Sequence, residues 1–121
     1  MLYITIDGDD IGQKISACYL SDDVIALQRI NGIVQERVIS IADILRGRGF
    51  EILFCAADGV AGRGEYISDN GAEIYKEIAN LVAPDLSFSA GTGGTLREAF
   101  IALLYAKSSG KSRICDYKDL K

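Results

Sequence analysis

The feature that most constrains the fold is the helical periodicity of residues 22–47. Apolar side chains recur there at three- and four-residue steps, at Leu27, Ile30, Val34, Val38, Ile41 and Leu45. Ser21-Asp22 offers a cap at the start, and Gly47 and Gly49 mark the end. Short segments rich in β-favouring residues lie on both sides, at 2–7 and 50–56. The pattern predicts one long amphipathic helix that packs on a sheet.

The other segments complete an ordered set of short elements. We expect helices at 9–20, 68–82 and 95–108, strands at 2–7, 50–56, 60–63, 86–91 and 113–117, and loops at 57–59 and 91–94. The order is βααββαβαβ. A hairpin between two helical crossovers predicts an α+β, ferredoxin-like sandwich, with an antiparallel-rich sheet and helices packed on one face.

Length and composition limit the classes of protein to which this chain can belong. The 121 residues are 49% hydrophobic and 25% charged, which predicts a single globular domain over residues 1–121. The sequence has no apolar run of membrane length and no basic, apolar leader, so we expect a cytoplasmic protein. It has three cysteines and no histidine, which excludes a zinc finger, a Ser-His-Asp triad and a Cys-His nucleophile. Cys18, Cys55 and Cys115 are expected to be small core residues.

The net charge of −4 is unevenly distributed. Residues 1–105 carry 8 Lys or Arg and 15 Asp or Glu, whereas residues 106–121 carry 5 Lys or Arg and 2 Asp. An acidic chain is a poor candidate for gripping a nucleic-acid backbone. It can still bind one polyanion if metal ions bridge to the acidic part and the basic end contacts the remainder.

An acidic cluster lies where the first strand ends and a helix begins, with the sequence DGDDIG at residues 7–12. Three carboxylates in four residues repel one another unless a cation neutralises them, and hard divalent cations prefer such oxygens. The helix start behind them offers free N–H groups to a phosphate. The alternative interpretation is that Asp9 or Asp10 simply caps the helix.

A second carboxylate site is expected in the hairpin turn, at Asp58. The strand after this hairpin should run antiparallel to the first strand and beside it, so the turn and the end of the first strand share one edge. Asp7 and Asp58 would then converge although 51 residues separate them. Converging carboxylates can hold two metal ions for an in-line phosphoryl displacement. The alternative is an ordinary Asp-Gly turn.

A third cluster, Lys107, Lys111 and Arg113, follows the last helix. The spacing required for a P-loop is missing. Lysines here can hold phosphates, or they can merely complement the dipole at the end of the helix. The loop at 91–94 could be an anion nest, but a tight strand-to-helix connection explains it equally.

Taken in order, these pieces resemble the palm domain of GGDEF-type nucleotide cyclases and of the polymerase subunit of type III CRISPR complexes. DGDDIG resembles the CRISPR palm motif DGDN-x-G, and AADG at 56–59 falls where the GGDEF or GGDD turn belongs. SAG at 89–91 resembles the S-I-G strand, and AKSSGKSRI at 106–114 resembles A-K-x-x-G-[KR]-N-x-[VI]. The likeness spans almost the whole chain and is greatest to the minimal CRISPR polymerases.

The resemblance implies a role for each matching residue. Asp7 and Asp58 would be the catalytic, metal-binding carboxylates, with the Gly8 carbonyl as a third ligand and Asp9 as a conditional one. The expected nucleotide-binding residues are Asp10, Ile11, Gly12, Ala57, Lys107 and Lys111. The expected cofactor is Mg²⁺ or Mn²⁺, two ions per active site.

The implied activity is metal-dependent nucleotidyl transfer that makes a cyclic di- or oligonucleotide from nucleoside triphosphates. A single half-site implies a homodimer, and the product implies a downstream receptor, in bacterial antiphage defence. The sequence departs from the pattern at Gly59, where an acidic residue is missing, and at Ile15, where diguanylate cyclases have a guanine-binding Asn. We therefore expect ATP as the substrate.

Three alternatives remain open from the residues alone. Asp9, Asp10, Asp58 and Lys107 have nearly the spacing of a CheY-like phosphoacceptor receiver, although residues 21–47 lack the strand that a receiver requires. An RNA-binding domain of the RRM type would need exposed aromatics and a basic face. A degenerate palm that binds nucleotide without turnover is the third, because Gly59 interrupts the motif.

Overall fold

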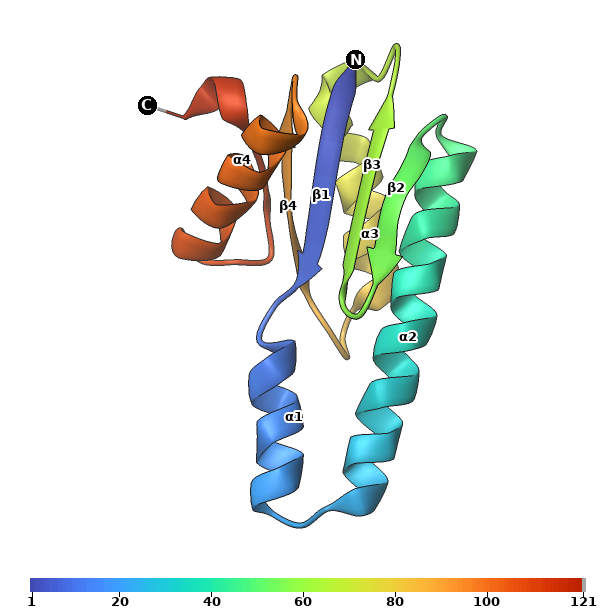
Figure 1. The fold of residues 1–121 in the computed structure, drawn as a ribbon, viewed down its shortest axis with the longest axis vertical. Helices are drawn as coiled ribbons and strands as arrows, with labels where there is room; N and C mark the ends of the chain where they lie inside the picture. The colour runs from blue at the N-terminus through green and yellow to red at the C-terminus, as the bar shows by residue number, and fades with distance from the viewer. Residues whose placement is uncertain (121) are drawn as a thin grey trace.

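A computed structural model describes residues 1–120 of the chain (Figure 1). The strands are β1 (Leu2–Gly8), β2 (Glu51–Ala56), β3 (Gly59–Gly64), β4 (Phe88–Gly93) and β5 (Ile114–Asp116). The α-helices are α1 (Ile11–Leu20), α2 (Val24–Gly47), α3 (Ala72–Val82) and α4 (Leu96–Ser108), and two short 3₁₀ turns, η1 and η2, span Ser68–Gly71 and Tyr117–Asp119. The predicted order of strands and α-helices is confirmed.

The five strands form one sheet in the order β2-β3-β1-β4-β5. β1 pairs antiparallel with β3 and with β4, β2 pairs antiparallel with β3, and only β4 and β5 are parallel. This confirms the α+β class with an antiparallel-rich sheet. It also shows that the receiver alternative is wrong, because receivers are built on a doubly wound parallel sheet.

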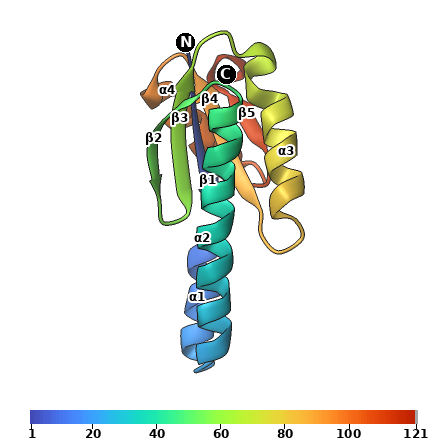
Figure 2. The ribbon, with the colours of Figure 1, turned by 90° about the vertical axis from the view of Figure 1, so that its right-hand side faces the viewer.

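The main core lies between the sheet and two helices, α2 and α3, which cover one face together (Figure 2). The sheet contributes alternate residues of its strands, among them Ile4, Ile6, Phe88 and Ala90. The helices contribute Val34, Val38, Ile41 and Leu45 from α2 and Ile74, Ile78 and Val82 from α3. The predicted apolar stripe is thus buried from Val34 to Leu45, whereas Leu27 and Ile30 are only partly buried.

Helix α4 packs against the opposite face of β4. This face carries Gly91 and Gly93, which alternate with the core residues Phe88 and Ala90. A side chain at Gly91 would place its Cβ 2.2 Å from the Ala99 carbonyl oxygen and 2.2 Å from the Leu103 nitrogen. At Gly93 the Cβ would lie 2.6 Å from the Glu98 Cβ. The backbone of α4 therefore rests directly on β4, and glycine is required there because no side chain fits between them.

Helices α1 and α2 form an antiparallel hairpin whose far end projects beyond the edge of the sheet (Figure 1). Asp23 caps α2, since its carboxylate accepts a hydrogen bond from the Ala26 N–H at 3.0 Å. The expectation that Ser21-Asp22 caps this helix is therefore wrong by one residue. Thr95 caps α4, since its hydroxyl oxygen accepts a hydrogen bond from the Glu98 N–H at 3.1 Å.

Several expected boundaries are wrong, because strand pairing and backbone conformation override local sequence. The sequence predicts a strand that ends at Gly91, but Thr92 and Gly93 extend it as β4, where Gly93 pairs with Tyr3 of β1. The helix expected at 68–82 begins at Ala72, because Asp69, Asn70 and Gly71 adopt left-handed backbone angles before it. The last strand is also shorter than expected, since η2 replaces its end.

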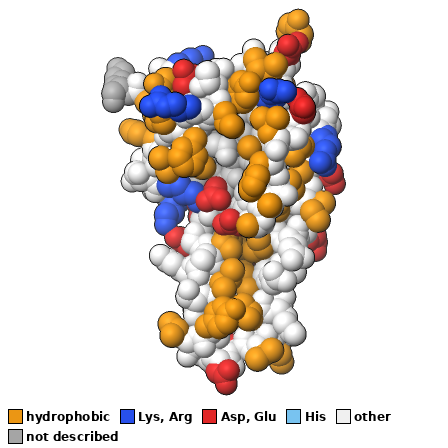
Figure 3. All heavy atoms as spheres, in the orientation of Figure 1, with side chains coloured by type: hydrophobic (Ala, Val, Ile, Leu, Met, Phe, Trp, Pro, Cys, Tyr) orange, Lys and Arg blue, Asp and Glu red, His pale blue; other side chains and the backbone are white. Residues whose placement is uncertain are grey.

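Several apolar side chains lie on the surface rather than in the core. Leu96, Phe100 and Leu104 of α4 and Phe54 of β2 are exposed, and Figure 3 shows hydrophobic side chains gathered on this face. Cys55 is also exposed, so its expected core placement is wrong, whereas Cys18 and Cys115 are partly buried. Within residues 1–120, no helix is both long and apolar enough to cross a bilayer.

Adding one methyl group should have opposite effects at two glycines. Gly91→Ala forces the new Cβ into the α4 backbone, so we expect the melting temperature to fall by about 10 °C or more, or folding to fail. Gly32→Ala is the matched control, because nothing lies within 4 Å of its Cβ and alanine favours a helix. It should stabilise the protein by about 1 kcal/mol. Thermal unfolding of both variants tests this, and a stable Gly91→Ala protein would contradict the packing.

Candidate active site

The end of β1, the β2–β3 turn and the start of α1 meet at one edge of the sheet. Asp7 pairs with Gly59 across β1 and β3, and the Gly8 N–H donates to the Asp58 carbonyl oxygen at 3.0 Å. A Cβ on Gly8 would lie 3.3 Å from Asp58 Oδ2, and one on Gly59 would lie 3.5 Å from Asp7 Oδ1. The structure thus brings Asp7 and Asp58 together, at the edge where the sequence placed them.

The Asp7 carboxyl is half-buried and close to a second negative charge. Burial raises the pKa of Asp7, and the charge of Asp58 raises it further, while Lys107 opposes both effects. A carboxylate pair of this kind costs free energy to ionise. The pair is therefore suited to a bound cation that neutralises it.

Lys107 of α4 reaches across to the oxygens at the end of β1. Its Nζ lies 2.7 Å from the Gly8 carbonyl oxygen, 3.2 Å from that of Asp7 and 3.3 Å from Asp7 Oδ2. The same ammonium donates to Asp9 Oδ1 at 2.9 Å. These backbone and carboxylate oxygens therefore already surround one positive charge.

Asp9 is buried and fully engaged by hydrogen bonds. Its Oδ1 accepts from Ser89 and Lys107, and its Oδ2 accepts from Ser87 and from the Ser112 N–H, at distances of 2.7 to 2.9 Å. Burial alone would raise the pKa of Asp9, but these hydrogen bonds together lower it below the ordinary value. Both oxygens of Asp9 therefore hold neighbouring segments together at the site, and its conditional assignment as a metal ligand stays a prediction.

Asp10 precedes α1 with a left-handed φ of 60°, and its side chain does not cap the helix. Its carboxylate instead forms an ion pair with Lys111, which lies after α4. The interpretation of Asp10 as a simple cap is therefore wrong. The N–H groups of the first turn of α1, including those of Ile11 and Gly12, have no acceptor within the helix and are free to bind an anion.

Ala57 lies in the two-residue turn between β2 and β3. Its φ of 51° is left-handed, a conformation that costs an alanine roughly 1–2 kcal/mol. It is exposed, and together with Asp58 it lines a cavity between α1 and α2. The turn therefore places Ala57 and the Asp58 carboxylate at the mouth of this cavity.

The donor set fits a hard divalent cation. Four carboxylates, Asp7, Asp9, Asp10 and Asp58, face two ammonium groups, Lys107 and Lys111, so negative charge is in excess. In residues 1–120 no group of three or more His, Cys, Asp or Glu side chains is arranged to hold a metal. The chain would thus supply Asp7, Asp58 and the Gly8 carbonyl, and water or a phosphate ligand would complete the coordination.

All ten expected site residues lie at this end of the molecule, but sequence reasoning missed five others. Three of them hold Asp9 by hydrogen bonds: Ser87, Ser89 and Ser112. Of these, only Ser89 lies in a motif singled out in the sequence, the SAG segment at 89–91. Asn31 and Gln35 of α2 line the cavity beside Asp58. Their separation of four residues on one helix face was the available signal.

Comparison with solved structures finds the same fold in nucleotide cyclases. The GGDEF domain of DgcB from Caulobacter crescentus, solved in complex with c-di-GMP, superposes with a TM-score of 0.76 at 13% identity, over 98% of this chain and 78% of that chain. The active GGEEF domain of a diguanylate cyclase from Vibrio cholerae gives 0.72 at 14% identity, over 98% and 83%. An EAL/GGDEF domain protein from M. capsulatus gives 0.64 at 19% identity, over 96% and 83%.

The identities are low, so these structures show the fold, which is that of a GGDEF-like palm. A comparison with curated proteins found no match. The sequence model of the minimal CRISPR polymerase domain, mCpol, matches residues 3–117, which is nearly the whole chain. The chain belongs to the mCpol family of minimal CRISPR polymerase domains.

Proposed function

We propose that this palm domain is a metal-dependent nucleotidyltransferase that makes a cyclic di- or oligonucleotide from nucleoside triphosphates, with ATP as the substrate. The observation that carries the proposal is the convergence of Asp7 and Asp58 beside a free helix N-terminus and two lysines. Membership of the mCpol family and the likeness to a domain solved in complex with c-di-GMP support it.

Asp7, Asp58 and the Gly8 carbonyl would hold Mg²⁺ or Mn²⁺, with two ions per site. The bound ions would neutralise the charge that develops on the α-phosphate and align it with the attacking ribose hydroxyl. The bond that forms joins the ribose oxygen to the α-phosphorus, and the bond that breaks releases pyrophosphate. Asp9 accepts hydrogen bonds from the Ser112 N–H, Ser87 and Ser89 and so would fix the backbone around the phosphates.

The triphosphate would lie against the start of α1. The backbone N–H groups of Asp10, Ile11 and Gly12 would bind its oxygens, with Lys107 and Lys111 on the β- and γ-phosphates. On this proposal Lys107 and Lys111 exchange their present carboxylate partners for phosphate oxygens when the nucleotide arrives.

A cyclic product requires two nucleotides to face each other. One chain offers one such half-site, so we propose a homodimer with two-fold symmetry. The product would act through a separate receptor, and we place this signalling in the bacterial cytoplasm, in antiphage defence. The excess of acidic residues in 1–105 agrees with a nucleotide substrate rather than a nucleic-acid strand.

Removing the charge of Lys111 should weaken nucleotide binding. Lys111→Met keeps the aliphatic stem but loses the ammonium group, so we expect affinity for ATP with Mg²⁺ to fall about tenfold. The melting temperature should barely change, because the Lys111–Asp10 pair is exposed. Lys118→Met is the matched control, since Lys118 lies in η2 outside the site. Titration calorimetry measures the affinity for ATP. Equal affinity in Lys111→Met and Lys118→Met would contradict the assignment of Lys111 to nucleotide binding.

Metal dependence gives the first test of the activity itself. Pyrophosphate release from ATP should require added Mg²⁺ or Mn²⁺ and should stop when EDTA is added. Re-addition of the metal should restore it, which separates loss of the ion from loss of the fold. Pyrophosphate release that persists in EDTA would contradict the proposed chemistry.

A further inference from the structure

The ammonium group of Lys107 lies among oxygens at the end of β1 that also suit a metal ion. Its Nζ contacts the Gly8 carbonyl oxygen at 2.7 Å and Asp9 Oδ1 at 2.9 Å. It also lies 3.2 Å from the Asp7 carbonyl oxygen and 3.3 Å from Asp7 Oδ2. We call these four oxygens the cation position. The Asp7 carboxylate and the Gly8 carbonyl within it are the groups expected to bind one of the two ions proposed for this site.

The two lysines beside the site are held in different ways. The Lys107 side chain is 21% exposed and is surrounded by oxygens, whereas the Lys111 side chain is 40% exposed and pairs with the exposed carboxylate of Asp10. An exposed ion pair contributes little, but an ammonium group enclosed by carboxylates neutralises their charge at short range. Lys107 is therefore the internal counter-ion of the acidic cluster, and Lys111 is a surface partner of it.

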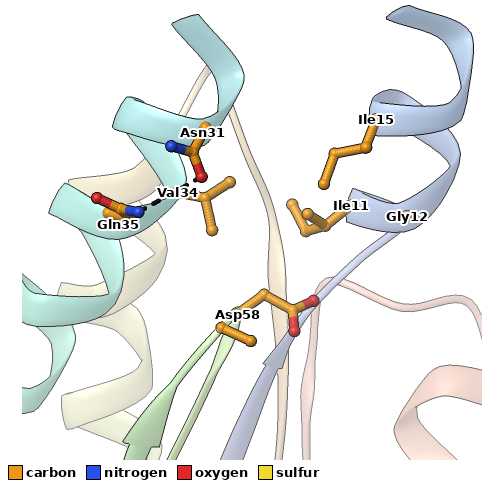
Figure 4. A pocket seen from close by; sticks show the side chains of 8 residues that line it. Ile11, Gly12, Ile15, Asn31, Val34, Gln35 and Asp58 are labelled. Carbon is orange, nitrogen blue, oxygen red and sulfur yellow. Dashed lines mark hydrogen bonds between the residues drawn. The ribbon is translucent and has the colours of Figure 1, made fainter. Parts of the chain in front are cut away.

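Asp58, the other carboxylate expected to bind metal, is not held by Lys107. Within residues 1–120 it forms no ion pair. Figure 4 shows its side chain below Ile11, at the base of the cavity between α1 and α2. Lys107 therefore blocks only the part of the expected metal site that β1 supplies.

Lys107 has room to leave the cation position. It lines a cavity of ≈ 220 Å³ beside α4, together with Asp7, Phe54 and Leu104. The flexible four-carbon stem of a lysine can move into such a space without displacing a packed side chain. Withdrawal of the ammonium group would leave the oxygens of Asp7 and Gly8 open to another cation.

We propose that Lys107 holds the cation position in the nucleotide-free protein and keeps a divalent ion out until a triphosphate draws the lysine away. This inference rests on the proposed function, since it takes the site to bind a triphosphate together with metal ions. A divalent ion and an ammonium group cannot share the same four oxygens, because their charges repel at such short range. The phosphates supply the negative charge that replaces the carboxylates as partners of Lys107. Binding of the nucleotide and binding of the ion should therefore strengthen each other.

The test is the affinity of the full chain for Mn²⁺ without nucleotide. It is measured by titration calorimetry and by the loss of the free Mn²⁺ signal in electron paramagnetic resonance. The wild-type chain should bind Mn²⁺ weakly. Lys107→Met keeps the aliphatic stem but removes the ammonium group, so it should bind Mn²⁺ at least about tenfold more tightly than the wild type. Damage to the fold would not produce this gain, which separates the role of Lys107 from a merely structural one.

Two further variants show whether the gain belongs to the cation position. Lys111→Met is the matched control, since it removes the same charge from the same cluster but outside this position. Its affinity for Mn²⁺ should stay within about threefold of the wild type. Adding Asp7→Asn to Lys107→Met should abolish the gain, because the ion then loses a carboxylate ligand.

Lys107→Met should fold, because the buried Asp9 carboxylate keeps other hydrogen-bond donors. These donors are Ser87, Ser89 and the Ser112 N–H. Lys107→Gln is the second variant, since it also removes the charge but retains N–H donors for the neighbouring oxygens. It should show the same direction of change in Mn²⁺ affinity, and thermal unfolding of both variants confirms that they are folded.

The outcomes separate this inference from the proposed function. If Lys107→Met and Lys107→Gln bind Mn²⁺ no more tightly than a wild type that makes product, the inference alone is overturned. An equal gain in Lys111→Met also overturns it, because the effect is then one of net charge. A gain confined to the Lys107 variants, in a chain that makes no product from ATP, supports the role of Lys107 and contradicts the nucleotidyltransferase. Absence of Mn²⁺ binding in every variant, with ATP binding that needs no metal, overturns both.

Discussion

Asp58→Asn should reduce product formation from ATP by about a thousandfold or more. The substitution keeps the shape of the side chain but removes one of two charges that would hold the metal ions, and such ions contribute several kcal/mol to stabilising the transition state. The loss should not reflect unfolding, because Asp58 is only partly buried and its removal relieves repulsion with Asp7. Pyrophosphate release and unfolding must be measured on the same preparation.

Asp43→Asn is the matched control for this experiment. Asp43 is an exposed acid on α2 whose partner is Arg46, one turn away, and it lies outside the site. It should retain wild-type turnover. Full turnover by Asp58→Asn would remove this carboxylate from the mechanism, and equal losses in both variants would point to an effect of net charge instead.

Asp9→Asn should be the most destabilising single change at the site, by about 3 kcal/mol or more. Asp9 accepts four hydrogen bonds, from Lys107, Ser87, Ser89 and Ser112. An amide cannot accept from all of these donors, and the substitution leaves the Lys107 ammonium without its buried counter-charge. Chemical denaturation measures the loss. Asp10→Asn, at the exposed neighbouring position, should change stability little.

The contribution of Asp9 should depend on pH in a defined direction. Its pKa is lowered in the folded state, so the unfolded chain binds more protons near the ordinary carboxyl pKa. The stabilisation is therefore present above that ordinary value and is lost as the pH falls through the folded-state pKa. The difference between wild type and Asp9→Asn should be constant near pH 7 and shrink below about pH 4. A difference that grows in acid would contradict the hydrogen-bonded, ionised Asp9.

The central convergence was predictable because it depends only on local order. A hairpin after the long helix must return beside β1, so the acid in its turn meets the acid at the end of that strand. The predicted start of the last helix at residue 95 also depends on local order, because Thr95 caps α4 through the N–H of Glu98, three residues further on. Neither inference needed the packing of side chains from distant segments.

The errors arise where distant segments decide the outcome. Thr92 and Gly93 have the local sequence of a loop, yet they extend β4, and α4 lies directly on this strand at Gly91 and Gly93. The role of Asp9 depends on three serines about 80 or 100 residues away, which no spacing rule connects. Asn31 and Gln35 flank the buried stripe of α2, and only the position of α1 creates the cavity that they line.

The most direct test of the account is mass spectrometry of the products made from ATP and Mg²⁺ by the full chain. We predict a cyclic oligoadenylate that carries no terminal phosphates, together with one pyrophosphate for each nucleotide joined, and no such product from Asp58→Asn. The contrary result would be a wild-type chain that binds ATP with Mg²⁺ but leaves it unchanged, whether ATP is supplied alone or with other nucleoside triphosphates. That result would contradict the claim that Asp7 and Asp58 form a nucleotidyltransferase site.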